Sequence, residues 1–152
     1  DVYKRQFLMA GHPGVDVSPL AKVASGGELS RIGLAIFTLT SRNTSVPTLI
    51  FDEVDSGVGG ATGEVVGRMM KQLGQTRQVL CVTHLPQVAA CGDHHLKVEK
   101  VSDGIETVSY LRELNPTQRV EEIARMLGGL LITQKTKVLA EEMVKANLSQ
   151  EE

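Results

Sequence analysis

Two adjacent acidic residues, Asp52 and Glu53, directly follow the apolar run of residues 48–51. Unpaired carboxylates are strongly disfavoured in a dry core, so a buried strand can place them only at its end. Open α/β sheets bind ligands at the carboxyl ends of their strands. Adjacent side chains point to opposite sides of a strand, so the two acids are expected to have different roles. Asp52 suits Mg²⁺ coordination, and Glu53 suits orientation or deprotonation of a water. The alternative is that both are solvated acids at a strand end.

A pair of glycines lies in Ser25-Gly26-Gly27-Glu28, at the start of a predicted helix over residues 26–41. Ser25 and Glu28 have the S-x-x-E spacing of a capping box. Glycines let a ligand approach the backbone closely, and the free amides and positive dipole end of a helix attract phosphate. Taken alone, these four residues fit a well-capped helix with a flexible entry better than they fit a phosphate site.

His84 follows a second apolar run, residues 79–83, of the same buried type as the run before Asp52. If the two runs are parallel strands, His84 reaches the same ligand edge as the acidic pair. A histidine at a strand end is more often a surface residue or one satisfied by its neighbours.

Zinc binding is a further alternative for part of this region. Two cysteines and three histidines have zinc-like spacing: Cys81-x₂-His84 and Cys91-x₂-His94, with His95 adjacent. This use is disfavoured, because Cys81 belongs to an apolar strand and is expected to point into the core.

The predicted elements are ordered as in an α/β fold. Strand–helix–strand over residues 48–83 predicts a βαβ unit with parallel strands. The predicted elements are a strand at 7–10, a loop to 24, a helix at 26–41, a strand at 48–51, a helix at 61–72, a strand at 79–83, a short helix at 86–91, a hairpin of 96–101 and 105–111, and helices at 117–127 and 133–148. We therefore expect a mostly parallel sheet with flanking helices, followed by a β-hairpin and two helices.

Composition excludes several classes of protein. The 152 residues carry 16 basic and 18 acidic side chains, for a net charge of −2, which argues against a simple basic nucleic-acid binder. Aromatic residues make up 3%, without tryptophan, so a base-stacking surface is not expected. No apolar run is long enough for a membrane helix, and two cysteines indicate a chain with reduced thiols. We expect residues 1–6 to be unordered or foreign to the natural protein, and residues 149–152 to fray.

The chain has no phosphate-cradling loop of its own. The pattern G-x-x-x-x-G-K-[ST] is absent, and the glycine cluster of residues 57–63 lacks the lysine and does not match G-x-G-x-x-G. The residues thus offer metal coordination, water activation and one phosphate contact, without a phosphate cradle.

Together these segments resemble the conserved motifs of an ABC-type ATPase, in the same order. Ser25–Glu28 resembles the signature motif, Asp52-Glu53 the end of Walker B with its catalytic glutamate, and His84 the switch histidine. The sequence of these segments resembles the RecN family of SMC-type DNA-repair ATPases more closely still, and this resemblance extends over about residues 7–148. The segments that carry this resemblance are Ala24–Arg31, Phe51–Gly60, Val82–Ala89 and Ile123–Gly129.

The resemblance implies the carboxyl-terminal half of an ATPase head that acts in DNA double-strand break repair and recombination, in the bacterial cytoplasm and at the nucleoid. A separate amino-terminal segment would carry Walker A, and two such heads would sandwich ATP. Ser25, Gly26 and Gly27 would face outward to the γ-phosphate bound on the opposite head, with Glu28 part of the same motif. In its own head, Asp52 would serve Mg²⁺, Glu53 the attacking water and His84 the γ-phosphate. The isolated chain is expected to be inactive.

Two positions depart from the wider ABC pattern. Ala24 replaces the usual leading leucine of the signature, and Gly59 occupies the place of an aspartate in the loop that reaches the partner head. Asp55 is the remaining candidate for that loop. The alternatives to a RecN-type head are a fragment of an ABC transporter's nucleotide-binding domain and a non-enzymatic dimerisation lobe.

Overall fold

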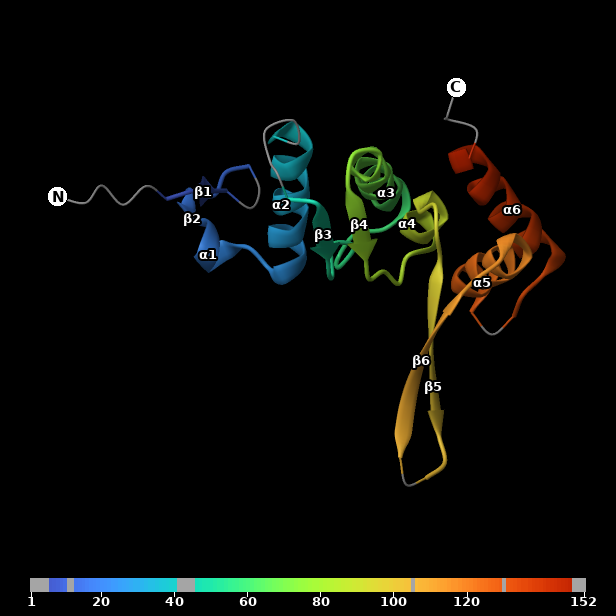
Figure 1. Ribbon diagram of the computed structural model, residues 1–152. Coiled ribbons are helices and arrows are strands. Elements are labelled where there is room, and N and C mark those ends of the chain that lie inside the picture. Colours follow the sequence, from blue (N-terminus) through green and yellow to red (C-terminus); the bar gives the residue numbers. More distant parts are fainter. Residues whose placement is uncertain (1–5, 11–12, 41–45, 105, 130, 149–152) are drawn as a thin grey trace.

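The computed structural model describes residues 6–10, 13–40, 46–104, 106–129 and 131–148. The expectations for residues 1–5 and 149–152 lie outside these ranges, and Gln6 is exposed without regular structure. The elements are β1 (Leu8–Met9), β2 (Ser18–Pro19), α1 (Leu20–Val23), α2 (Gly26–Thr40), β3 (Thr48–Phe51), α3 (Gly60–Gly74), β4 (Gln78–Cys81), α4 (Pro86–Cys91), β5 (Leu96–Ser102), β6 (Thr107–Glu113), α5 (Pro116–Gly128) and α6 (Gln134–Leu148). They follow one another in an elongated row, from which the β5–β6 hairpin projects (Figure 1). None of the helices in the described ranges is both long and apolar enough to cross a membrane.

The predicted βαβ unit is present. Strands β3 and β4 are parallel and in register from Thr48 opposite Gln78 to Phe51 opposite Cys81, and α3 connects them. The Val82 amide continues the ladder by donating to the Phe51 carbonyl at 3.0 Å. The two strands therefore end side by side, as the sequence analysis required.

A mostly parallel sheet is not confirmed. The described strands form three two-stranded sheets, of which β3–β4 is parallel, while β1–β2 and β5–β6 are antiparallel. One face of the parallel pair packs in the core, but on the other face Ile50 is 71% and Val82 63% exposed. The sequence predicted strands that are apolar on both faces, and this chain covers only one of them.

The loop predicted before residue 24 contains short elements that the sequence analysis missed. Strand β2 pairs with β1, with Leu8 opposite Pro19, and α1 follows directly. The Leu20 amide donates to the Phe7 carbonyl at 2.9 Å. Pairing between segments this short has no periodicity in the sequence, so pattern analysis cannot find it.

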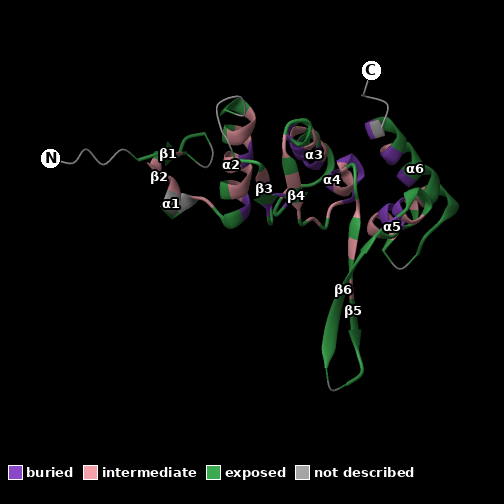
Figure 2. Ribbon diagram, in the orientation of Figure 1, coloured by how far each residue is buried: buried purple, intermediate pink, exposed green. Residues whose placement is uncertain are grey.

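The main core lies between α2, α3 and the β3–β4 pair. Its buried side chains are Leu34, Leu49, Phe51, Val54, Val66, Met70, Leu73 and Val88. Helix α4 packs closely on α3 because Gly67 has no side chain: a Cβ there would lie 2.7 Å from the Cys91 Sγ. Purple segments on the facing sides of these helices mark this core in Figure 2.

A second core joins α4 to α5 and α6. Its buried residues are Ala90, Ile123, Ala124, Ala140 and Val144. Helix α5 begins with a capping box, in which the Asn115 side chain accepts from the Gln118 amide at 2.9 Å and the Gln118 side chain accepts from the Asn115 amide at 3.1 Å. The buried Arg119 donates to the carbonyls of Ala90, at 2.9 Å, and Gly92, and so satisfies carbonyls at the end of α4.

The predicted hairpin is present as β5 and β6, and most of its residues are exposed (Figure 2). An isolated two-stranded hairpin is marginally stable in water, so its attachment matters. Glu122 on α5 contributes to this attachment: its side chain is 9% exposed and pairs with Lys97 on β5 at 2.8 Å and with Arg125 on its own helix at 2.6 Å. The hydrogen bonds from Arg125 chiefly lower the pKa of Glu122, against the effect of burial and with help from Lys97, to about 2.

These ion pairs predict a specific pH dependence of folding. Because the folded pKa of Glu122, about 2, lies below its ordinary 4.5, the pairs stabilise the chain above pH 4.5 and lose this effect as the pH falls toward 2. We expect Glu122→Gln to reduce the free energy of unfolding near neutral pH by about 3 kcal/mol, and to flatten its decline in acid. Urea unfolding over a pH series measures both.

The matched control is Glu141→Gln, which removes an exposed pair with Lys145 on α6, where the N–O distance is 3.7 Å. Exposed pairs contribute little, so this variant should follow the wild type at every pH. Parallel pH curves for wild type and Glu122→Gln would contradict the assigned role of Glu122.

Candidate functional site

Asp52, Glu53 and His84 emerge at one edge of the β3–β4 pair. Asp52 and Glu53 follow the last residue of β3, and His84 comes three residues after Cys81, the last residue of β4. Because the strands are parallel and Phe51 is opposite Cys81, both ends meet at the same edge. This confirms the expectation of a common rim. Asp52 and Glu53 are exposed, and the His84 side chain is 71% exposed.

A tight turn after β3 orients the acidic pair. The Ser56 amide donates to the Glu53 carbonyl at 2.9 Å, and Glu53 has a φ of +56°. Among the described residues, Glu53 is the one non-glycine residue with positive φ, a conformation that costs about 1–3 kcal/mol. The completely buried Val54 next to it anchors the turn. The kink therefore leaves two carboxylates at the surface while the following residues turn inward.

The signature-like segment forms the expected capping box. The Ser25 amide and hydroxyl donate to the same Glu28 oxygen at 2.7 and 3.0 Å, and the Glu28 amide donates to the Ser25 hydroxyl at 3.3 Å. The hydrogen bond from the Ser25 amide is the main reason that the pKa of Glu28 is lowered, and the Ser25 hydroxyl adds to it. The Glu28 carboxylate is thus occupied in capping α2.

The first turns of α2 are fastened to the turn that carries Glu53. The Ser30 hydroxyl donates to the Asp52 carbonyl at 2.9 Å. Arg31 donates to the carbonyls of Val54 at 3.2 Å and Ser56 at 2.6 Å. Helix α2 therefore holds the backbone of residues 52–56 through three hydrogen bonds.

The two signature glycines have different environments, which corrects the expectation that both face outward. Gly27 is buried against its own chain: a Cβ there would lie 2.9 Å from both the Glu53 carbonyl oxygen and the Ser56 Cβ. Gly26 is exposed, and its Cβ position is 3.4 Å from the Glu53 Oε2. Ser25 is exposed as well. An outward phosphate contact can therefore come from Ser25 and Gly26, whereas Gly27 permits the close approach of α2.

Asp55 was expected to be the candidate for a loop that reaches the partner head. It is only 1% exposed, so it does not lie on such an exposed loop. Its Oδ2 accepts from the Thr83 hydroxyl at 2.5 Å and from the amides of His84 and Leu85 at 2.9 and 3.2 Å. The Nδ1 of His84 is 3.2 Å from the same oxygen. Burial acts to raise the pKa of Asp55, but these donors and the nearby histidine outweigh burial and lower it.

The sequence does not reveal the roles of Thr83 and Leu85 as donors to Asp55. Thr83 ends the apolar run before His84, and its β-branched side chain is what a strand prefers, so nothing local marks its hydroxyl as functional. The one local signal is that Asp55 directly follows the apolar Val54, shortly after the buried strand β3. That signal does not identify a partner 28 to 30 residues away.

Zinc binding finds no support in the described part of the chain, where no three histidine, cysteine or acidic residues group so as to hold a metal. Burial, and then the charges of Asp55 and Asp52, raise the pKa of Cys81 to about 12, so the thiol stays protonated. Cys91 is buried and donates to the Gln87 carbonyl at 3.2 Å. The exposed carboxylate of Asp52 is, by contrast, the hard oxygen donor that Mg²⁺ takes together with waters and phosphate oxygens.

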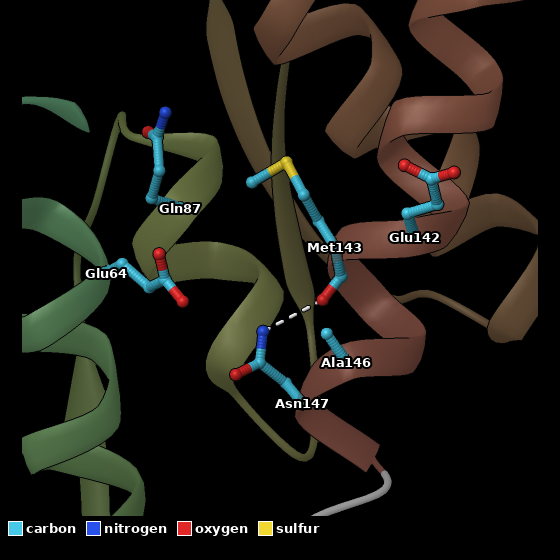
Figure 3. Close-up of a pocket in the computed structure, with 6 residues that line it drawn as sticks. All are labelled: Glu64, Gln87, Glu142, Met143, Ala146 and Asn147. Atoms are coloured by element: carbon cyan, nitrogen blue, oxygen red, sulfur yellow. Dashed lines mark hydrogen bonds between the residues drawn. The ribbon is translucent and has the colours of Figure 1, made fainter. Parts of the chain in front are cut away.

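A separate cleft of about 240 Å³ lies between α3, α4 and α6 (Figure 3). The residues that line it are Glu64, Gln87, Glu142, Met143, Ala146 and Asn147. The Asn147 side chain donates to the Met143 carbonyl at 2.8 Å and accepts from Cys91 at 3.4 Å, so it is committed to packing. None of the predicted site residues lines this cleft.

Comparison with known proteins decides the family. A DNA repair protein RecN from Vibrio cholerae serotype O1 is 50% identical over 140 residues, which cover 92% of this chain and 25% of the relative. One from Halalkalibacterium halodurans is 45% identical over 139 residues, covering 91% of this chain and 25% of the relative. This chain belongs to the RecN family. It spans about a quarter of the length of the curated relatives it matches.

The fold agrees with this family assignment, although no family model matches the chain. A solved structure described as "Structural biochemistry of ATP-driven dimerization and DNA stimulated activation of SMC ATPases" superposes with a TM-score of 0.54. The superposition covers 78% of this chain and 70% of that one, at 23% identity. The chain thus shares its fold with most of that structure.

The different environments of the two signature glycines predict different tolerance to alanine in this RecN chain. Gly27→Ala should lower the free energy of unfolding by about 1–3 kcal/mol, because its Cβ meets backbone and a Cβ that cannot move away cheaply. Gly26→Ala is the matched control and should be close to neutral, because its Cβ meets only the end of the Glu53 side chain. Urea unfolding of both variants tests this; equal stabilities would contradict the close docking of α2.

Proposed function

We propose that this chain is the carboxyl-terminal half of the ATP-hydrolysing head of a RecN-type protein that acts in DNA double-strand break repair and recombination. The observation that carries this proposal is the common rim, where Asp52, Glu53 and His84 follow two parallel strands in register. The docking of the signature helix α2 on the same rim supports it further, through Ser30 and Arg31.

In the proposed site each residue has one role toward ATP. Asp52 holds Mg²⁺ directly or through water, and Mg²⁺ when bound neutralises charge on the phosphates. Glu53 orients the attacking water and takes its proton. His84 contacts the γ-phosphate of the same head. Ser25 and Gly26 contact the γ-phosphate on the opposite head, and Gly27 and Glu28 shape that contact by packing and capping.

We propose that residues 7–148 form one lobe and that an amino-terminal half of the same head, carrying Walker A, completes it. The exposed apolar face of the pair supports this, because Ile50 on β3, Leu80 on β4 and Val82 just after β4 are exposed although the sequence there suits burial on both sides. Further strands on this side would give the mostly parallel sheet that the resemblance implies. The 152-residue chain alone contains no phosphate-cradling motif, so we propose that it does not hydrolyse ATP by itself.

The proposed partners of the complete protein are a second head, with ATP between the two, and DNA. The related solved structure is described in terms of ATP-driven dimerization and DNA stimulated activation, which supports both. A bacterial DNA-repair role also implies a cytoplasmic protein that acts at the nucleoid. The relatives named RecN favour this reading over the transporter alternative.

Removal of the proposed base tests the chemistry. In the full-length protein, Glu53→Gln should keep ATP binding and ATP-dependent dimerisation, and should lower the rate of phosphate release by about 10²–10⁴-fold, the usual loss for a positioned base. The exposed Glu121 on α5 offers the matched control, since Glu121→Gln should hydrolyse ATP at the wild-type rate. Turnover of Glu53→Gln near that of the wild type would rule out the role.

The exposed face of β3 makes a second test possible. When the two halves of the head are expressed as separate chains, Ile50→Glu should weaken their association at least about tenfold, because docking would bury an unpaired carboxylate. Leu139→Glu on α6 is the control, as Leu139 is 47% exposed on another helix. Titration by calorimetry measures both, and unchanged affinity for Ile50→Glu would show that the amino-terminal half docks elsewhere.

A further inference from the structure

We propose that Asp55 is a positioning residue that fixes His84 relative to the turn carrying Glu53. The inference rests on the proposed function, because it assigns Asp55 a task within that same site. Asp55 lies two residues after Glu53, in the turn after β3, whereas its donors all lie just after β4. One carboxylate thus joins the two segments that bear the site.

The backbone contacts carry most of this argument. The amides of His84 and Leu85 both donate to Asp55 Oδ2, at 2.9 and 3.2 Å. These amides immediately precede α4, which begins at Pro86, a residue without an amide hydrogen. A carboxylate that accepts both amides holds the backbone of His84 in one place, and the 3.2 Å approach of its Nδ1 to the same oxygen sets the side of the ring that faces inward.

Burial makes this arrangement rigid. Asp55 is 1% exposed, and a buried carboxylate that loses its donors pays the full desolvation cost, so the contacts must form together. The Thr83 hydroxyl, 2.5 Å from Oδ2, completes the set. At the other end of α4, Arg119 donates to the Ala90 carbonyl at 2.9 Å, so the helix that follows His84 is anchored at both ends.

The exposure of the His84 ring indicates a role other than packing within the fold. Its side chain is 71% exposed although its backbone is held by a buried residue. A histidine needed only for packing would be buried, and one needed only for solubility would need no such anchor. The geometry therefore suits a ring presented to a ligand at the rim from a fixed position.

The test compares Asp55→Asn, His84→Ala and the double variant in the full-length protein. Asparagine keeps the shape of the side chain but removes its charge, and it replaces one accepting oxygen by an NH₂ group that can only donate. We expect Asp55→Asn to lower kcat for ATP about 10–100-fold with KM within about twofold, as for a misplaced catalytic group. Adding Asp55→Asn to His84→Ala should cause no further loss beyond about twofold, because Asp55 acts through His84. Multiplicative losses in the double variant would overturn the proposal.

A measurement without ATP separates this inference from the proposed function. In ¹⁵N-histidine-labelled full-length protein without nucleotide, the ring signals of His84, assigned by their loss in His84→Ala, should shift in Asp55→Asn. Shifted signals in a protein that hydrolyses no ATP would uphold the positioning and reject the ATPase. Unchanged signals would overturn the positioning, whatever the activity.

Two further variants guard against a general loss of folding. Glu122→Gln also replaces a buried carboxylate by an amide, but far along the chain at the base of the hairpin, and it should leave kcat and the His84 signals unchanged. If Asp55→Asn does not fold, Thr83→Val provides the test, since it keeps the Asp55 carboxylate but removes the hydroxyl that donates to it at 2.5 Å and that accepts from the Leu85 amide at 3.0 Å. It should shift the His84 signals and lower kcat in the same direction, and wild-type behaviour would overturn the proposal.

Discussion

The buried carboxylate of Asp55 is the interaction on which the arrangement of the rim depends. It accepts hydrogen bonds from Thr83, His84 and Leu85, which lie 28 to 30 residues further along the chain. The β3–β4 ladder brings two strand ends together, but it leaves the loops after them free to adopt many conformations. Asp55 removes that freedom, because a carboxylate at 1% exposure must keep its donors.

Helix α2 imposes the second constraint, from the opposite side of the same turn. Ser30 and Arg31 donate to backbone carbonyls of residues 52–56, and Gly27 allows the helix to approach within van der Waals contact. The strained conformation of Glu53 persists because its surroundings fix the residues on both sides. Helix α2, whose first residues follow the exposed Ser25, is therefore held by hydrogen bonds and close packing against the turn that carries the proposed base, Glu53.

The covered and uncovered surfaces divide the chain into two functional parts. Toward α5 and α6, the second core and the Arg119 contact join these helices to α4, and the Glu122 contact joins α5 to the hairpin. On the other face of the β3–β4 pair, Ile50 on β3, Leu80 on β4 and Val82 just after β4 are exposed. The chain thus buries one face of the β3–β4 pair and leaves the other face exposed.

The sequence by itself determined the features that arise from near neighbours. The Ser25–Glu28 capping box, the βαβ unit, the hairpin around Gly104 and the order of the helices all follow from periodicity and short-range hydrogen bonds. The motif order also indicated the family. Only the tertiary structure decided that Asp55 turns inward, that Gly27 packs while Gly26 faces out, and that the sheet is covered on one side. The physical reason is that burial and long-range hydrogen bonds depend on strand register and on which surfaces meet, and no local pattern records either.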